Sequence, residues 1–179
     1  LLGREADVRA VTDLLADPAV RLVTVTGSAG LGKSRVAQTA VERSQEHFRH
    51  GAVAVSCTGL TDDRQVARAL ARALGLALAA DVSVSAQLTG CLRSCQVLLL
   101  FDRFEHVLAA APKLAALLQS APGVKALVTS QVALRLAQRR AEIQFGHRNN
   151  QFHRGRVRAQ RGGDDADPVA GLGRSAAQN

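Results

Sequence analysis

Apolar residues recur along this chain with two spacings, and segments of the two kinds alternate. Apolar positions three and four residues apart predict a helix over residues 5–16, which Asp17 and Pro18 end. Short runs of β-branched and other apolar residues predict strands over residues 21–26, 52–57, 96–101, 124–130 and 141–145. Further helices are predicted over residues 33–48, 62–74, 84–93 and 104–119, with Pro112 as a candidate break in the last.

This alternation of strands and helices indicates the fold class. Strands separated by helices of about 10 to 15 residues are typical of βαβ units and a parallel sheet. Residues 96–101 are almost wholly apolar, as expected of a strand that is buried on both faces. We therefore expect an α/β fold in which helices flank a mostly parallel sheet.

The chain divides into two parts by composition. Residues 1–145 carry the periodic pattern and are long enough for one domain. Residues 146–179 contain six Arg and three Asp but almost no periodic apolar residues, so we expect a basic, disordered tail. The sequence begins at Leu1 and contains no Met, which indicates a fragment, and the abrupt change suggests a truncation or frameshift near residue 146.

Charge and cysteine content narrow the functional classes. The net charge of +8 is spread along the chain, which favours a solvated basic surface over a dedicated nucleic-acid site. The three cysteines, Cys57, Cys91 and Cys95, form no even disulfide framework, and no secretory signal opens the chain, so a reducing cytoplasm fits best. Cysteine as a small buried apolar residue is favoured over a metal site. The apolar runs are too short to cross a bilayer, so no membrane partner is expected.

The candidate chemistry centres on residues 27–34, where a glycine-rich turn joins a predicted strand to a predicted helix. The spacing GxxxxGK[ST] is that of a phosphate-binding loop, in which backbone N–H groups and the helix N-terminus surround phosphate oxygens. Lys33 would reach the β- and γ-phosphates, and Ser34 would offer a hydroxyl to Mg²⁺. The predicted phosphate-binding residues are Gly27, Ser28, Ala29, Gly30, Leu31, Gly32, Lys33, Ser34 and Arg35. This motif specifies the expected fold as a P-loop NTPase three-layer sandwich.

A carboxylate ends the most apolar strand. Asp102 follows residues 97–101, and in an open parallel sheet ligands bind at the carboxyl ends of the strands. We therefore predict that Asp102 and Ser34 are the protein ligands of Mg²⁺. The alternative is a buried strand that ends in Asp without any function.

Hydrolysis would also need a group that positions the attacking water, commonly a carboxylate. Arg103 stands where many ATPases of this type carry an acid, so Glu105 is the nearest candidate for a catalytic residue. Glu105 could equally be a carboxylate at a helix start that interacts with the helix dipole.

Four segments occur here in the order known from one family: residues 2–5 (Leu-Gly-Arg-Glu), the phosphate loop, residues 99–106 and residues 127–130 (Leu-Val-Thr-Ser). Over residues 1 to about 145 the chain resembles the nucleotide-binding domain of bacterial signal-transduction ATPases with numerous domains (STAND ATPases), which are related to NB-ARC domains. It is most similar to the version in actinobacterial transcriptional regulators with LuxR-type DNA-binding domains. The resemblance implies adenine contacts by Leu2, Gly3 and Arg4, and a lid and DNA-binding domains elsewhere in a larger protein.

Two positions depart from that family's pattern. The family often has Asp-Asn or Asp-Asp where this chain has Asp102-Arg103, and an Arg that senses the γ-phosphate where this chain has Gln131. Binding of ATP or ADP with Mg²⁺ is therefore better supported than turnover.

Four functions follow as hypotheses. The favoured one is an ATP/Mg-binding switch module of a transcriptional regulator, with weak or no hydrolysis alone. The alternatives are an active ATPase that converts ATP to ADP and phosphate, a nucleic-acid binder acting through the tail, and a non-functional gene remnant. Direct DNA binding is disfavoured, because no aromatic stacking platform or recognition helix accompanies the tail arginines Arg148, Arg154, Arg156, Arg158 and Arg161.

Overall fold

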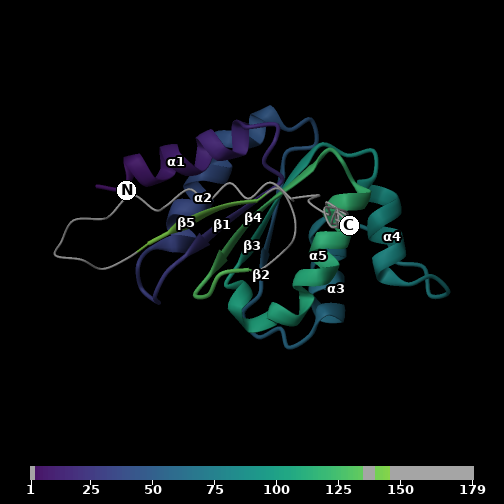
Figure 1. The fold of residues 1–179 in the computed structure, drawn as a ribbon. Coiled ribbons are helices and arrows are strands. Elements are labelled where there is room, and N and C mark those ends of the chain that lie inside the picture. The colour runs from purple at the N-terminus through teal and green to yellow at the C-terminus, as the bar shows by residue number, and fades with distance from the viewer. Residues whose placement is uncertain (1–2, 135–139, 146–179) are drawn as a thin grey trace, which may run out of the picture.

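Helices lie on both faces of a five-stranded sheet (Figure 1). The structure is a computed structural model, and it describes residues 3–134 and 140–145. The helices are α1 (Glu5–Ala16), α2 (Lys33–Ser44), α3 (Asp63–Ala73), α4 (Val84–Leu92) and α5 (Ala111–Ser120), with the 3-10 segments η1 (Gln45–His47) and η2 (Phe104–Ala110). The strands are β1 (Leu22–Thr26), β2 (Ala52–Ser56), β3 (Val97–Asp102), β4 (Val124–Ser130) and β5 (Arg140–Gln144).

All neighbouring strands of the sheet run parallel, in the order β2-β3-β4-β1-β5. Thr26 at the end of β1 pairs with Ser130 at the end of β4, and Phe101 near the end of β3 pairs with Val128 of β4. The carboxyl ends of these three strands therefore lie along one edge of the sheet. Ligands of open α/β sheets bind at this edge.

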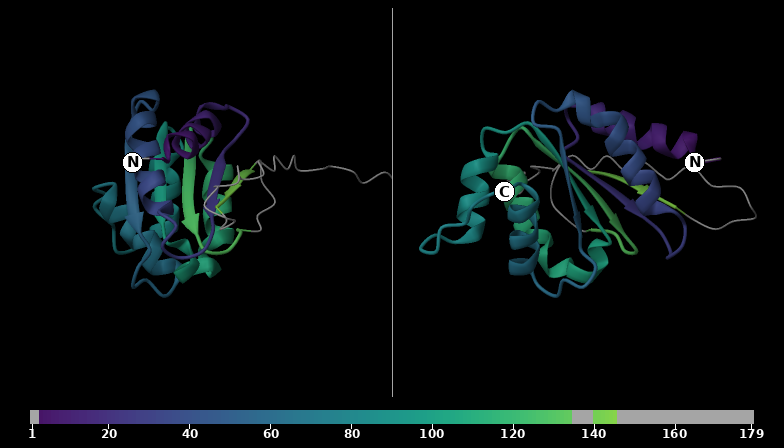
Figure 2. Two further views of the ribbon diagram at one scale, coloured as in Figure 1. Left: turned by 90° about the vertical axis from the view of Figure 1, so that its left-hand side faces the viewer. Right: turned by 180° about the vertical axis from the view of Figure 1, so that it is seen from behind.

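Each face of the sheet has its own apolar core, and Figure 2 shows the resulting layers edge-on. Because side chains alternate along a strand, Leu98 and Leu100 of β3 pack with α1 and α2, whereas Leu99 and Phe101 pack with α3, α4 and α5. Residues 97–101 are all buried. The prediction of an α/β three-layer sandwich with a parallel sheet is confirmed.

Two predicted helices end or begin differently in the structure. The helix predicted over residues 33–48 ends at Ser44 and continues as the 3-10 turn η1. The segment predicted as a helix over residues 104–119 starts as 3-10 structure and turns at Val107, whose φ is −134°. Pro112 does not break it, because this residue lies in the first turn of α5, where a missing backbone N–H costs no helical hydrogen bond.

Cys57, immediately after β2, behaves as a small apolar core residue. Its side chain is fully buried, and burial, with smaller contributions from the charges of Asp102 and Glu105, raises the pKa of its thiol to about 12. All three cysteines are free. Within the described ranges, no three His, Cys, Asp or Glu residues cluster as a metal site would need.

The described part of the chain contains no helix of the length and apolarity needed to cross a membrane. The predicted tail, residues 146–179, lies outside the described residues, as does Leu2.

Candidate functional site

The phosphate loop connects β1 to α2 at the ligand-binding edge of the sheet, and its shape depends on glycine. Gly27 has a φ of 145°, and a Cβ at this position would lie 2.5 Å from the carbonyl oxygen of Phe145. Gly32, the residue before α2, has a left-handed conformation with a φ of 75°. Residues with a Cβ rarely adopt such backbone conformations, so this loop requires glycine at these two positions.

Lys33 is the first residue of α2, and its side chain reaches back across the loop. Its Nζ atom donates hydrogen bonds to the carbonyl oxygens of Gly27 and Ser28, both at 2.8 Å. Desolvation by burial lowers the pKa of Lys33; the charges of Glu105 and Asp102 raise it, and that of Arg103 lowers it further. The ammonium group therefore lies within the electrostatic reach of all three groups.

Asp102 is the last residue of β3, and the neighbouring strand holds its carboxylate. The hydroxyl Oγ1 of Thr129 on β4 donates a hydrogen bond to Asp102 Oδ1 at 2.5 Å. The same Oγ1 accepts a hydrogen bond from the backbone N–H of Arg103 at 2.9 Å. Because Thr129 is only 1% exposed, Asp102 and the start of the following turn are held in one position.

Arg103 makes the turn that leads from β3 into η2. It has a φ of 59° and a ψ of 50°, and it is the only non-glycine residue with a positive φ in the described ranges. This left-handed conformation is unfavourable for a residue with a Cβ. The side chain of Arg103 is exposed at the edge of the site.

A cavity of about 410 Å³ brings six of the nine predicted phosphate-binding residues together with Glu105, whereas Gly27, Ser28, Leu31 and Asp102 do not line it. Lys33, Ser34 and Arg35 line it from the loop and α2, while Arg103 and Glu105 line it from the segment after β3. The other lining residues are Ala29, Gly30, Gly32, His106, Thr129 and Gln131.

Gln131, immediately after β4, contacts the candidate catalytic carboxylate. Its side-chain Nε2 donates a hydrogen bond to Glu105 Oε1 at 3.2 Å, and its backbone N–H donates to Glu105 Oε2 at 3.3 Å. Both oxygens of Glu105 are thus hydrogen-bonded across the cavity wall. Glu105 is the second residue of a 3-10 segment rather than part of a regular helix.

Comparison with known proteins places this loop and sheet in a family. Residues 19–138 match the family model described as an AAA domain. The chain belongs to the AAA domain family. Membership of this family implies nucleotide binding.

Curated relatives of this AAA domain are uncharacterized proteins of Mycobacterium tuberculosis and Mycobacterium bovis. Each is 36% identical over 137 residues, which cover 76% of this chain and 34% of the relative. The AAA domain therefore spans about a third of the length of the curated relatives it matches.

Solved structures share the fold of this AAA domain. Cdc6p from Pyrobaculum aerophilum has a TM-score of 0.63 at 16% identity, over 74% of this chain and 40% of that one. The ORC2 protein of Aeropyrum pernix, solved as ADPNP-ADP complexes, has a TM-score of 0.56 at 16% identity, over 73% of this chain and 41% of that one. At these identities the likeness shows the fold alone.

Arg4 of the AAA domain, predicted as an adenine contact, links three segments beside the loop. Its guanidinium donates hydrogen bonds to the carbonyl oxygen of Leu31 and, at 3.0 Å, to Asp7. The guanidinium also lies 5.1 Å from the ring centroid of Phe145, after β5. Adenine contact by Gly3 and Arg4 stays a prediction, and Leu2 lies outside the described residues.

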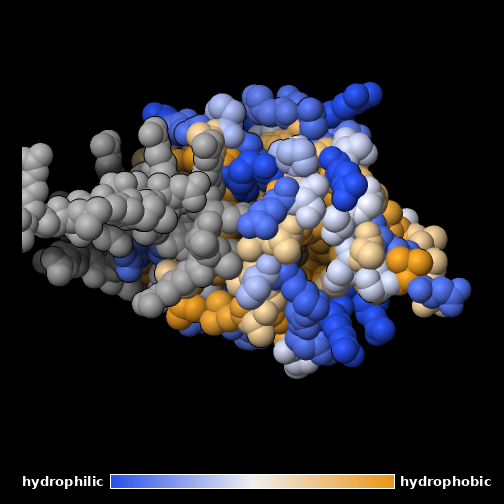
Figure 3. All heavy atoms as spheres, turned by 45° about the vertical axis from the view of Figure 1, so that its right-hand side comes forward, coloured by the Kyte–Doolittle hydropathy of each residue, from blue (hydrophilic) through white to orange (hydrophobic). Residues whose placement is uncertain are grey.

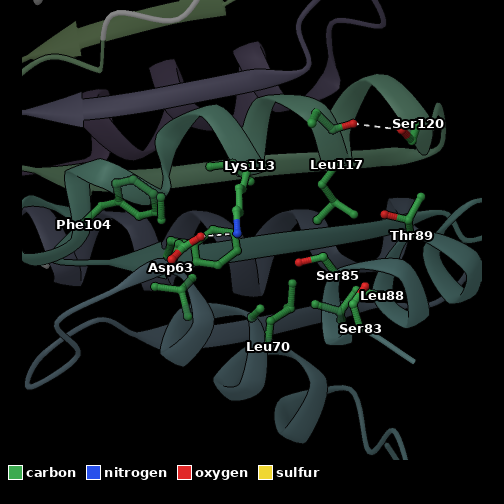
Figure 4. Close-up of a pocket in the computed structure, with 16 residues that line it drawn as sticks. Asp63, Leu70, Ser83, Ser85, Leu88, Thr89, Phe104, Lys113, Leu117 and Ser120 are labelled. Atoms are coloured by element: carbon green, nitrogen blue, oxygen red, sulfur yellow. Dashed lines mark hydrogen bonds and ion pairs between the residues drawn. The ribbon is translucent and has the colours of Figure 1, made fainter. Parts of the chain in front are cut away.

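A second cavity, of about 420 Å³, lies between α3, α4, η2 and α5 on the other side of β3 (Figure 4). In Figure 4, Lys113 on α5 points toward Asp63 on α3, and the two form an ion pair. The remaining lining is largely apolar with a few hydroxyl groups, and apolar side chains also show among polar ones on this side of the molecule (Figure 3). Because the ammonium group of Lys113 already forms an ion pair with Asp63, this cavity is less suited to phosphate than the phosphate loop is.

The sequence did not single out Thr129 or the contact between Gln131 and Glu105. One signal for Thr129 was available: if β3 and β4 are neighbours, extending their register by one residue places Thr129 opposite Asp102. The sequence alone does not supply that strand order.

Proposed function

We propose that this AAA domain binds ATP with Mg²⁺ and acts as a nucleotide-dependent switch module of a larger transcriptional regulator, with slow hydrolysis or none on its own. The observation that carries the proposal is the cavity where Lys33 and Ser34 of the phosphate loop face the ends of β3 and β4. Loop N–H groups, the N-terminus of α2 and the Lys33 ammonium offer the donors and positive charge that phosphates need.

The residues present fit a magnesium ion. Mg²⁺ takes oxygen ligands and is commonly held by one or two protein groups together with substrate phosphates. Ser34 and Asp102 would hold it, and Asp102 has an oxygen beyond the one bonded to Thr129. When bound, the ion neutralises phosphate charge.

Slow hydrolysis is supported by the surroundings of Glu105. Both of its carboxylate oxygens accept hydrogen bonds from Gln131, which therefore competes with an attacking water for these acceptors. A carboxylate engaged in this way is less available to orient an attacking water.

An active ATPase is the second candidate, and the presence of Glu105 in the cavity favours it. In that case Glu105 orients water and Asp102 holds Mg²⁺. Measurement of phosphate release by the wild type and the Glu105→Gln variant separates an ATPase from a binding module.

The role in a transcriptional regulator is supported by the order of motifs shared with LuxR-type regulators of the STAND class. The curated relatives support only the placement of such a domain within a longer protein, since the match covers 34% of their length. Adenine binding by residues 2–4 belongs to the same proposal.

Titration calorimetry with Mg-ATP on the chain and on a Lys33→Ala variant tests the proposal. Heat of binding that disappears in the variant supports it.

A further inference from the structure

Arg103 occupies a costly backbone conformation at the edge of the phosphate cavity. A left-handed conformation disfavours residues with a Cβ, and Asn or Gly would adopt it more readily. Conformations of this kind persist where the surroundings impose them, and they concentrate at functional sites. The hydrogen bond from the backbone N–H of Arg103 to Thr129 Oγ1 is one such constraint, because it connects Arg103 to the hydroxyl that also bonds to Asp102.

The position of Arg103 within the cavity differs from that of the other cations. Lys33 and Arg35 line the cavity from the loop and α2, whereas Arg103 follows β3 on the opposite wall. The loop surrounds the inner phosphates of a nucleotide, and the end of the phosphate chain extends toward the ends of the strands. The third phosphate of a bound triphosphate would therefore lie on the side of the cavity that Arg103 lines, and a diphosphate would lack the group that extends there.

Three cationic side chains and one carboxylate line the cavity, so the lining has an excess of positive charge that an anion would neutralise. Arg103 and Lys33 line the same cavity from opposite walls, so their like charges repel each other. Gln131 carries no charge, and its side chain is engaged with Glu105. A phosphate between Lys33 and Arg103 turns this repulsion into two attractions, and a guanidinium binds phosphate through two parallel hydrogen bonds.

We propose that Arg103 binds the terminal phosphate of a nucleoside triphosphate and so makes this site prefer ATP over ADP. The inference rests on the proposed function and specifies which nucleotide state the site recognises. Arg103 is a specificity-determining residue in this account, and its backbone strain is the cost of placing a guanidinium at that point.

The test compares Arg103→Asn with the wild-type chain, using titration with Mg-ATP, Mg-ADP and a non-hydrolysable β,γ-imido analogue of ATP. The variant binds ATP and the analogue about tenfold more weakly, which corresponds to one lost charge-assisted contact, while its ADP affinity stays within about twofold of wild type. Because Asn accepts the left-handed conformation, the thermal midpoint of the nucleotide-free variant is equal to or above that of the wild type.

These two readouts separate a binding role from a merely structural one, since a structural residue would lose stability and both nucleotides together. Arg103→Lys keeps the charge without the paired hydrogen bonds and falls between the wild type and Arg103→Asn. Arg93→Gln, at an exposed arginine that follows α4 outside the cavity, is the control for loss of one positive charge and leaves both affinities unchanged.

Equal loss of ATP and ADP affinity in Arg103→Asn, or no loss of either, overturns the assignment while the proposed function stands. A wild-type chain that binds neither nucleotide overturns the proposed function and this inference together.

Discussion

Gln131 donates two hydrogen bonds to Glu105, one from its side-chain amide at 3.2 Å and one from its backbone N–H at 3.3 Å. Gln131 is uncharged, so a neutral side chain binds the candidate catalytic carboxylate at the edge of the phosphate cavity. This contact joins the segment after β3 to the segment after β4.

If the second candidate function, an active ATPase, is correct, Glu105→Gln is predicted to lower phosphate release by at least about 100-fold, because an amide cannot accept the proton of an attacking water. Affinity for Mg-ATP stays close to wild type, since the phosphate loop is untouched. Single-turnover hydrolysis and calorimetry measure the two effects separately. An unchanged rate would remove Glu105 from the mechanism.

Gln131→Ala is predicted to raise the slow basal hydrolysis several-fold. Loss of the amide donor leaves Oε1 of Glu105 without its hydrogen bond from Gln131, so this oxygen can accept one from a water molecule instead. The rate of phosphate release at saturating ATP is the measurement, and a fall in that rate would show that Gln131 helps hydrolysis instead.

Thr129→Val removes the hydroxyl that bonds to both Asp102 and the backbone of Arg103. The free energy of unfolding should fall by about 1–3 kcal/mol, the cost of leaving inward-facing polar groups without a partner. The Mg²⁺-dependent part of ATP affinity should fall with it. Thr129→Ser, which keeps the hydroxyl, is the matched control, and equal loss in both variants would count against the hydrogen bond as the cause.

Arg4→Ala removes the side chain that connects the start of α1 to the phosphate loop. Loss of the bonds to Leu31 and Asp7 and of the contact with Phe145 should lower the free energy of unfolding by about 1–2 kcal/mol. Arg9→Ala, at an exposed arginine of the same helix, should change it little. Urea denaturation of both variants compares them, and similar losses would mean that helix content rather than the Arg4 contacts decides stability.

Gly27→Ala places a methyl group 2.5 Å from the carbonyl oxygen of Phe145 in a conformation that alanine rarely adopts. Loss of about 2–3 kcal/mol in the free energy of unfolding is expected. Gly90→Ala is the opposite case, because Gly90 lies in the last turn of α4 with open space around it, and alanine there should stabilise the protein by up to about 1 kcal/mol. Denaturation that gives both variants the same sign would contradict this account of the loop.

Much of the fold could be predicted from the sequence because its signals are local. The apolar spacing in residues 5–16 and the run from Val97 to Phe101 determine their elements without reference to the rest of the chain. The helix predicted over residues 33–48 is α-helical only to Ser44, and the helix predicted over residues 104–119 is divided between Ala110 and Ala111, next to the candidate break at Pro112. Periodicity does not reveal the 3-10 structure at these two places.

The site was predictable only where a motif is contiguous. Gly27 to Ser34 and the end of β3 were identified from residue spacing, and the structure brings Lys33, Ser34 and Asp102 to one edge of the sheet. The bond between Thr129 and Asp102 joins residues 27 positions apart through the pairing of β3 with β4, and the left-handed turn at Arg103 follows from that bond. Such relationships depend on strand order, which the sequence does not state.

The most direct measurement is calorimetric titration of the full chain with Mg-ATP beside its Lys33→Ala variant. Lys33 bonds the carbonyl oxygens of Gly27 and Ser28 and would exchange these contacts for phosphate oxygens. Saturable binding by the wild type and an affinity reduced by at least about 100-fold in the variant is the predicted result. Identical heats for the two proteins at millimolar ATP would contradict the claim that this loop binds nucleotide.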